Sequence, residues 1–412
     1  MEQRKVAITG IGCITPFGVG KAVFTENLLA GKSSIRKIRT FDASGFDTDI
    51  AAEVIDFNPG DFWDAKSVKR HDRVSHLAIA TARMALKDAG LESPAYDPAK
   101  FGVVMGTGIG GLTILCRDHK NLLELGPGRV SPFYIPASIV NMPAGLISIE
   151  FGLKGPNYVC VSACASSTHA IGLAMEHIRY GRADAMVTGG AEAAVIPLGL
   201  AGFTAMRALS TGFRDTPEKA SRPFDKLRDG FVMGEGGAML ILEEMDAAKK
   251  RGAKIYGELA GYGLSADAHH ITAPSPQGEG AQIAMRMAVN DAGLKFEDID
   301  HINAHGTSTP YNDPTETEAI KIVFGERARQ IPINSTKSMI GHMLGASGAA
   351  EMAAAMLCAE KGMVHPTINQ EVPDPECDLD YVPNVARKYI WKAMLLNSFG
   401  FGGQNACLVV KR

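Results

Sequence analysis

Cys164 stands where a thiol could act as a nucleophile. It follows an apolar run at residues 158–161 and precedes a pattern typical of an amphipathic helix, which predicts a strand-to-helix turn. Unpaired backbone N–H groups and the positive end of the helix dipole at such a turn favour the thiolate. Most lone cysteines are buried core residues, but small neighbours here leave room for a substrate. We therefore predict that Cys164 is a nucleophile.

Two histidine segments far downstream have similar surroundings. His305 ends a short apolar strand and is followed by a Gly-Thr-Ser-Thr turn. Lys337 and His342 lie near the start of an Ala/Gly-rich helix that we expect to continue through Glu351. One cysteine and two histidines could bind zinc, but the chain has no C-x-x-C, no H-E-x-x-H and no close ligand pair. We therefore predict a Cys/His nucleophilic site without a metal.

The elements that must position these residues occur twice. Residues 83–91 (RMALKDAGL) recur as residues 286–294 (RMAVNDAGL), and each copy reads as a helix ended by glycine. Each copy then leads to a strand and a Gly-Thr turn. The chain therefore reads as two α/β halves, residues 1–252 and residues 253–412, which divide after a charged helical stretch.

Composition narrows the class of protein. The 412 residues are 46% hydrophobic and 21% charged, with a formal net charge of −3, as expected for a globular protein that binds no nucleic acid. No apolar stretch reaches the roughly 20 residues that a membrane span needs, and the N-terminus lacks the apolar region of a signal peptide. The seven scattered cysteines form no disulfide framework. We expect a cytoplasmic protein.

Segments spread along the whole chain resemble one enzyme family, the elongating (type II) β-ketoacyl-acyl-carrier-protein synthases of the thiolase superfamily. The similar segments are residues 6–12, 106–111, 158–170, 221–231, 303–307, 334–346 and 397–403. Two departures occur. Ser166 and Ser167 stand where the family more often has Thr-Gly, and Gln404 where Thr or His is common; neither removes a catalytic group.

The resemblance implies a fold and a reaction. The fold is the thiolase fold, an α/β architecture in which two mixed five-stranded sheets form a duplicated α-β-α-β-α five-layer sandwich. The reaction is a decarboxylative Claisen condensation of malonyl-acyl-carrier-protein with an acyl group on Cys164, a step of fatty-acid chain elongation. Backbone N–H groups of Cys164 and Phe401 would form the oxyanion hole. His305 and His342 would stabilise the enolate, and Lys337 would keep the site's geometry, through an ion pair with Glu351.

The resemblance also implies roles for residues around the centre. Thr307 and Thr309 would bind the pantetheine amides, and Phe401, between glycines, would act as a gate. The residues expected to support that gate are Asp267, His270 and Thr272. The acyl pocket would be lined by Ile109, Gly199 and Phe203, with Phe133 contributed by a partner subunit.

Partners and cofactors follow from the same comparison. We expect a homodimer that receives its substrates from acyl carrier protein. The basic residues expected at the docking site are Lys66, Lys69, Arg70 and Arg207, with Arg73 next to them. No cofactor is required, although a structural monovalent cation could bind near Asn303, Glu351 and Asn397.

Four other functions are alternatives. A chain-initiating synthase would carry Asn where His342 stands. A degradative thiolase uses a second cysteine late in the chain, and Cys407 lacks the Cys-x-Gly turn that this requires. A polyketide ketosynthase has the same chemistry and stays open. A non-catalytic partner subunit would have lost Cys164.

Overall fold

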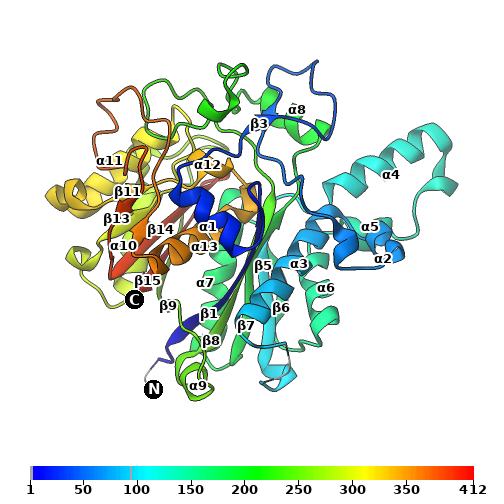
Figure 1. Ribbon diagram of the computed structural model, residues 1–412, viewed down its shortest axis with the longest axis horizontal. Helices are drawn as coiled ribbons and strands as arrows, with labels where there is room; N and C mark the ends of the chain where they lie inside the picture. Colours follow the sequence, from blue (N-terminus) through cyan, green and yellow to red (C-terminus); the bar gives the residue numbers. More distant parts are fainter. Residues whose placement is uncertain (1–2, 93–94) are drawn as a thin grey trace.

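Two five-stranded halves of mixed sheet form the frame of the protein (Figure 1). The computed structural model describes residues 3–92 and 95–412. In the first half the strand order is β6-β5-β7-β8-β1, and in the second it is β11-β10-β14-β15-β9. The strands are β1 Val6–Thr15, β5 Phe101–Gly106, β6 Asn157–Cys160, β7 Ala185–Glu192, β8 Gly236–Glu244, β9 Gly257–Ala266, β10 His301–Asn303, β11 Ile333–Asn334, β14 Ala393–Gly400 and β15 Gln404–Lys411.

Both halves have the same pairing pattern. The three strands at the outer end of each half are parallel, and the two nearest the middle are antiparallel to their neighbours. The halves are joined, because β1 pairs with β9 through three residue pairs at Val6, Ala7 and Ile8. The two expected five-stranded sheets are both present, but they are joined edge to edge into one continuous sheet. This joining depends on contacts between distant segments, which local sequence patterns do not record.

Helices complete the five layers. The middle layer consists of α7 (Ser166–Arg179) and α13 (Ser347–Glu360), whose residues share one apolar core with both halves of the sheet. The outer helices α3 (Arg73–Asp88) and α6 (Met142–Phe151) pack on the first half. The outer helices α10 (Glu279–Asp291) and α11 (Asn312–Phe324) pack on the second. The expected sandwich is therefore present, with the two central helices between the sheets.

The remaining elements are short, apart from α4. They are α1 Lys21–Leu29, α2 Ala65–Arg70, α4 Leu112–Leu125, α5 Tyr134–Ser138, α8 Pro197–Ala205, α9 Met245–Lys250, α12 Lys337–Ile340, β2 Gly18–Val19, β3 Arg36–Lys37, β4 Ile50–Ala51, β12 Met363–Val364 and β13 Arg387–Lys388. The 3-10 turns are η1 Pro59–Asp61, η2 Pro98–Lys100, η3 Pro127–Arg129, η4 Ala163–Ala165, η5 Pro217–Lys219, η6 Pro276–Gly278, η7 Phe296–Asp298, η8 Gly325–Gln330 and η9 Leu344–Ala346. Figure 1 shows α4 projecting from the body of the molecule beside α5.

The repeat predicted from the sequence is visible in the helix ends. α3 and α10 are each followed, after one alanine, by a glycine in the left-handed region, Gly90 at φ 68° and Gly293 at φ 63°. A glycine here lets the chain turn away from the last helical carbonyl groups without a Cβ penalty. The two copies therefore end in the same way, as their shared sequence predicts.

The described ranges contain no helix with the length and apolar character needed to cross a bilayer.

Candidate active site

Cys164 lies at the predicted strand-to-helix turn. β6 ends at Cys160, and η4 carries the chain into α7. Ala163, just before the cysteine, has φ 48°, a conformation uncommon for a residue with a Cβ. This tight turn places the sulfur, with the residue 7% exposed, at the wall of a cavity of about 630 Å³.

The cavity gathers the predicted catalytic groups from both halves. Cys164 comes from the first half, and His305 and His342 come from the second. The sulfur and one nitrogen of each imidazole all lie within 4.8 Å of one another. The two rings stand 5.5 Å apart, nearly perpendicular. A substrate carbonyl near the sulfur is therefore within reach of both histidines.

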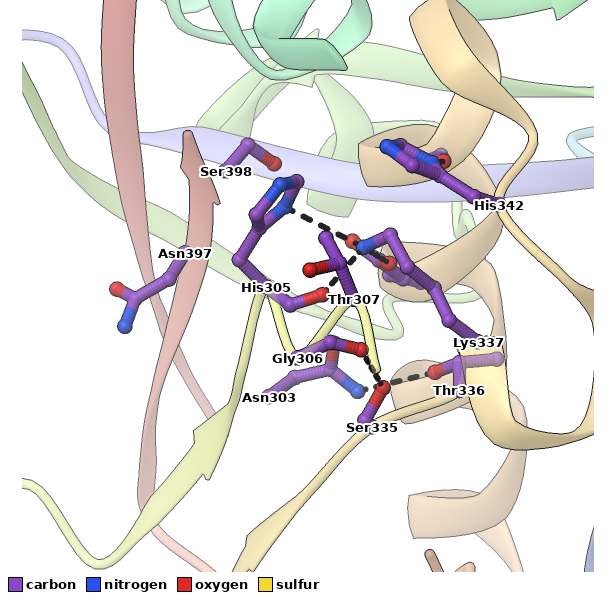
Figure 2. Close-up of polar contacts among 12 residues, drawn as sticks. Asn303, His305, Gly306, Thr307, Ser335, Thr336, Lys337, His342, Asn397 and Ser398 are labelled. Atoms are coloured by element: carbon purple, nitrogen blue, oxygen red, sulfur yellow. Dashed lines mark hydrogen bonds and ion pairs between the residues drawn. The ribbon is translucent and has the colours of Figure 1, made fainter. Parts of the chain in front are cut away.

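Lys337 contacts both the ring and the backbone of His305 (Figure 2). Its buried Nζ donates to the carbonyl oxygen of His305 at 2.6 Å, forms an ion pair with Glu351, and lies 3.3 Å from Nδ1 of His305. These contacts use all three ammonium protons, so no proton is left for direct chemistry. The ion pair expected from the sequence is confirmed. Because Nδ1 of His305 faces a donor, we assign the ring proton to Nε2.

Other groups contact Nδ1 of His342, as Lys337 contacts Nδ1 of His305. Nδ1 of His342 lies 2.8 Å from Oγ of Ser347 and accepts from the N–H of Leu344 at 3.2 Å. Burial, together with the Lys337 charge, holds the pKa of His305 and of His342 well below the usual value. Both rings are therefore neutral near pH 7. With Nε2 protonated they are poised to donate a hydrogen bond to a substrate oxygen.

The resting state of Cys164 is set by opposing effects. Burial raises the pKa of the thiol to about 11, and the Lys337 charge and the N–H group of Phe401 oppose this rise only in part. In the free site, the preference of the helix N-terminus for the thiolate is therefore opposed. The reason is desolvation, which disfavours the charged form and which the sequence pattern did not reveal.

The geometry around position 400 suits an oxyanion hole. The N–H groups of Phe401 and of Cys164 both face the sulfur and act to lower its pKa. A Cβ on Gly400 would lie 3.3 Å from the nitrogen of Cys164 and 2.5 Å from the carbonyl oxygen of Ser162. Glycine at position 400 therefore keeps the approach to these donors open.

Thr307 and Thr309 lie in the cavity wall, as expected for contacts to a polar substrate arm. Their hydroxyl groups are 2.9 Å apart, so one can donate to the other while an acceptor site stays free. The turn that carries them rests on Asp313, whose carboxylate accepts from the N–H groups of Thr307 and Ser308 at 3.0 and 3.2 Å.

The three expected gate-support residues line the same cavity. Asp267 accepts from the side-chain amide of Asn405 at 2.7 Å, and its own N–H donates to the carbonyl oxygen of Gly403 at 2.8 Å. His270 instead binds its own loop, because its Nδ1 accepts from the N–H groups of Thr272 and Ala273. Asp267 alone of the three therefore contacts the glycine-rich loop directly.

The expected pocket residues divide into two groups. Ile109 and Phe203 line the cavity, and both pack against the same apolar cluster. Gly199 does not line it; this buried glycine lies against the backbone of Ala194, where a Cβ would clash. Phe133 lies outside the cavity and is 40% exposed, with the guanidinium of Arg70 4.5 Å from its ring centroid.

The basic residues expected to dock a partner are also split. Lys66 and Lys69 are exposed on α2, and Arg70 beside them is half-buried. Arg207 follows α8 and lies at the cavity mouth. Arg73 is an exception, since it pairs with the buried carboxylate of Glu235 at 2.8 Å and so belongs to the fold rather than to a free patch.

One local expectation was wrong. The helix expected from Lys337 through Glu351 is broken: α12 ends at Ile340, Gly341 has φ 67°, and α13 begins only at Ser347. His342 therefore stands in a turn between two helices. The side chain of Asn397 donates to Glu316 at 3.2 Å, and its Oδ1 accepts from the thiol of Cys407 at 3.2 Å.

Two buried carboxylates near the site were not among the predicted residues. Glu316 accepts from the N–H groups of His305 and Gly306, each at 2.8 Å, and burial raises its pKa to about 7. Glu192 accepts from the backbone N–H groups of Gly108, Ile109 and Gly345. The available signal for Glu192 was an acidic residue within the apolar, small-residue run 185–195.

The chain belongs to the β-ketoacyl synthase family, whose N-terminal domain matches residues 3–248 and whose C-terminal domain matches residues 256–371. The 3-oxoacyl-[acyl-carrier-protein] synthase 2 of Coxiella burnetii is 49% identical over 412 residues, covering 100% of this chain and 99% of the relative. The enzyme of that name from Synechocystis sp. is 50% identical over 413 residues with the same coverage.

Solved structures of similar proteins have the same fold. A β-ketoacyl synthase from Burkholderia phymatum has a TM-score of 0.92 at 36% identity, and 99% of each chain is covered. A type II polyketide acyl-carrier protein in complex with its ketosynthase gives a TM-score of 0.92 at 37% identity over 100% of both chains. The fold is thus the thiolase fold of ketosynthases, and the protein is a condensing acyltransferase.

Proposed function

We propose that this protein extends acyl chains by two carbons in fatty-acid synthesis, using acyl carrier protein as the source of both substrates. The observation that carries the proposal is the cavity in which a cysteine thiol, open backbone N–H groups and two neutral imidazole donors converge. These groups match the two charges that develop in a decarboxylative condensation.

The first step loads the primer. The Cys164 sulfur attacks the acyl thioester, the acyl–sulfur bond to the carrier breaks, and the thiol proton leaves with the carrier's thiol. The oxygen of the tetrahedral intermediate accepts from the N–H groups of Cys164 and Phe401. No strong base is required overall, because the proton lost by one thiol is regained by the other.

The second step forms the carbon–carbon bond. The malonyl thioester loses carbon dioxide, and its electron pair passes to the thioester oxygen, which accepts from Nε2–H of His305 and of His342. The resulting carbanion attacks the acyl carbon on Cys164. The sulfur departs and takes up a proton from solvent, leaving a 3-oxoacyl thioester two carbons longer. Neutral donors suit this step, since neither leaves a buried cation once the enolate is consumed.

A carrier protein is the proposed partner. A relative of known structure is a ketosynthase in complex with a type II polyketide acyl-carrier protein. Arg207 is exposed at the mouth of the cavity, and Lys66 and Lys69 are exposed on α2. Carrier proteins of this kind are acidic, and local positive charge speeds the encounter with an acidic partner.

We also propose a homodimer in a reducing, cytoplasmic setting. Exposed apolar side chains lie on α4, α5 and α6 and just after the edge strand β6, where a second copy would cover them. They are Leu122, Leu123, Leu125, Ile135, Ile139, Ile149 and Val161. The seven cysteines are free, as a reducing compartment favours.

A structural monovalent cation is a further part of the proposal. Oδ1 of Asn303 and Oε2 of Glu351 are buried oxygens with no hydrogen-bond partner in the part of the chain that the structure describes. Such oxygens suit a cation that stabilises the fold. A melting temperature that rises with potassium but not with tetramethylammonium would support binding there.

The second candidate is a polyketide ketosynthase, since one solved relative at 37% identity is a ketosynthase in complex with a type II polyketide acyl-carrier protein. Another, at 36% identity, is a ketosynthase/chain length factor. The higher identity to the fatty-acid enzymes, 46–50%, favours the first candidate.

The experiment is acylation followed by extension. The protein is incubated with acyl carrier protein charged with saturated primers, and peptide mass spectrometry locates the acyl group. We expect it on Cys164 and expect Cys164→Ser to lose it, with Cys160→Ser as the matched control. Labelled malonyl carrier protein then gives a product two carbons longer. Acyl label on Cys160 or Cys407 in place of Cys164 would contradict the proposal.

A further inference from the structure

The two halves can be aligned turn by turn at the site. In the first half, Ala163 at φ 48° opens η4, and the 14-residue helix α7 follows. In the second half, Leu344 at φ 46° opens η9, and the 14-residue helix α13 follows. The matched turns place Gly345 at the position that corresponds to the nucleophile Cys164. The second half therefore keeps the nucleophile's turn without the nucleophile.

The strands that face these turns align as well. β7 and β14 both have eight residues, and each pairs its last residue with the first residue of the next strand of its half. Glu192 ends β7 and Gly400 ends β14. Each strand end faces the turn of the opposite half: Gly400 lies next to the N–H of Cys164, and Glu192 lies next to the N–H of Gly345.

The matching positions differ in one decisive respect. Beside Cys164 the glycine leaves the N–H donors open for a substrate oxygen. Beside Gly345 the carboxylate of Glu192 fills the corresponding space. One oxygen accepts from the N–H groups of Gly108 at 2.6 Å and Gly345 at 3.0 Å, and the other accepts from Ile109 N–H at 3.2 Å and Thr107 Oγ1 at 3.1 Å.

Glu192 itself is 0% exposed and pairs with these dipoles rather than with a positive charge. Four donors around one buried carboxylate resemble the way an oxyanion hole surrounds a charged oxygen. Two of the donor residues, Gly108 and Ile109, line the cavity, and Gly345 follows the lining residue Leu344. The carboxylate therefore links two separate segments of the cavity lining.

We propose that Glu192 fills a second, pseudo-symmetric oxyanion hole and acts as a positioning residue that fixes the primer pocket. It joins the loop of Ile109 to the turn of Leu344 and Gly345, so it sets how sharply the pocket distinguishes primer lengths. This inference rests on the proposed function, because it concerns the acyl group that Cys164 accepts. Glu192 itself touches no substrate.

The test begins with Glu192→Gln. A glutamine oxygen can still accept from Gly108 and Gly345, but its NH₂ group then faces the N–H of Ile109, which loses its acceptor. One neutral hydrogen bond is worth about 0.5–1.5 kcal/mol, a factor of roughly 2 to 12. We expect the ratio of kcat/KM for the longest accepted primer to that for a two-carbon primer to change by about that factor. Malonyl decarboxylation should change less than twofold.

Glu53→Gln is the matched control. Glu53 is also 0% exposed and accepts from two backbone N–H groups and a hydroxyl, on Arg39 and Thr40, but these groups do not line the cavity. It should lower stability without altering the primer ratio. Equal changes in the two variants at every primer length would overturn the proposal and leave Glu192 a purely structural residue.

A second pair of measurements covers the case in which Glu192→Gln folds poorly. Thr107→Val keeps the carboxylate and removes one donor, so it should shift the primer ratio in the same direction by a smaller factor. Glu192→Ala empties the hole, and formate should restore the wild-type ratio in a saturable manner. No shift in Thr107→Val and no effect of formate would also refute the proposal. A wild-type protein that is not acylated on Cys164 would refute the proposed function instead.

Discussion

Lys337→Met tests the assignment of the His305 proton. The change removes the ammonium group and keeps a side chain of similar length. The carboxylate of Glu351, 1% exposed, then has lost its ion-pair partner. Breaking a buried ion pair at one end costs about 3–5 kcal/mol, and we expect a loss of that size in the free energy of unfolding, measured by urea denaturation.

The same change removes the donor that faces Nδ1 of His305. The ring can then carry its proton on Nδ1, and Nε2 no longer donates to the enolate oxygen. Loss of one such donor lowers the rate by about 10²–10³, or roughly 2.7–4 kcal/mol. Carbon dioxide release from malonyl carrier protein measures this step, and the mass of acylated Cys164 shows that the site still loads.

The double variant Lys337→Met/Glu351→Met separates the two effects. It removes both charges, so most of the lost stability should return. Decarboxylation should stay low, because His305 still lacks its donor. If decarboxylation recovers together with stability, Lys337 acts only through the fold and the assignment of the ring proton is wrong.

Three further outcomes are expected. Ile109→Phe should shorten the accepted primers and spare those of two to six carbons, since each buried methylene contributes about 0.8 kcal/mol; equal loss at every length in the extension assay would remove Ile109 from the pocket wall. Charge reversal at Lys69 and Arg207 should raise KM for carrier-bound substrate but not for small thioesters, with Lys250→Glu as control, and an unchanged salt dependence of carrier binding would count against the docking patch. Burial lowers the pKa of His301 to about 3, so its stabilising effect is present above pH 6.5 and is lost as pH falls towards 3; His301→Phe should flatten that part of the stability curve, and an identical acid-unfolding profile would contradict it.

The sequence predicted the parts of the site that depend on local turns. The positions of Cys164 and His305 at strand ends follow from short apolar runs that stop at small residues. The ion pair between Lys337 and Glu351 was expected from the family resemblance, and the structure contains it. The division after residue 252 stays a prediction.

Properties set by distant contacts were not predictable in the same way. The neutral thiol of Cys164 results from burial by both halves, which a single turn does not encode. In sequence, Arg73 looks like part of a basic surface cluster. In the structure its guanidinium instead pairs with the carboxylate of Glu235, which is 162 residues away. Gly199 follows the family pattern but meets the backbone of Ala194 instead of the cavity.

The central position of β1 has a consequence for biosynthesis. This strand lies between β8 and β9, and all ten of its residues are buried. It leaves the ribosome long before either partner, since β1 ends at Thr15 and β8 begins at Gly236. At about 5–20 residues per second, roughly 10–50 seconds separate the synthesis of β1 from that of β8. For that time the nascent chain carries an apolar segment whose only available strand partner is the two-residue β2, so its yield depends on how well that segment is shielded in the cell.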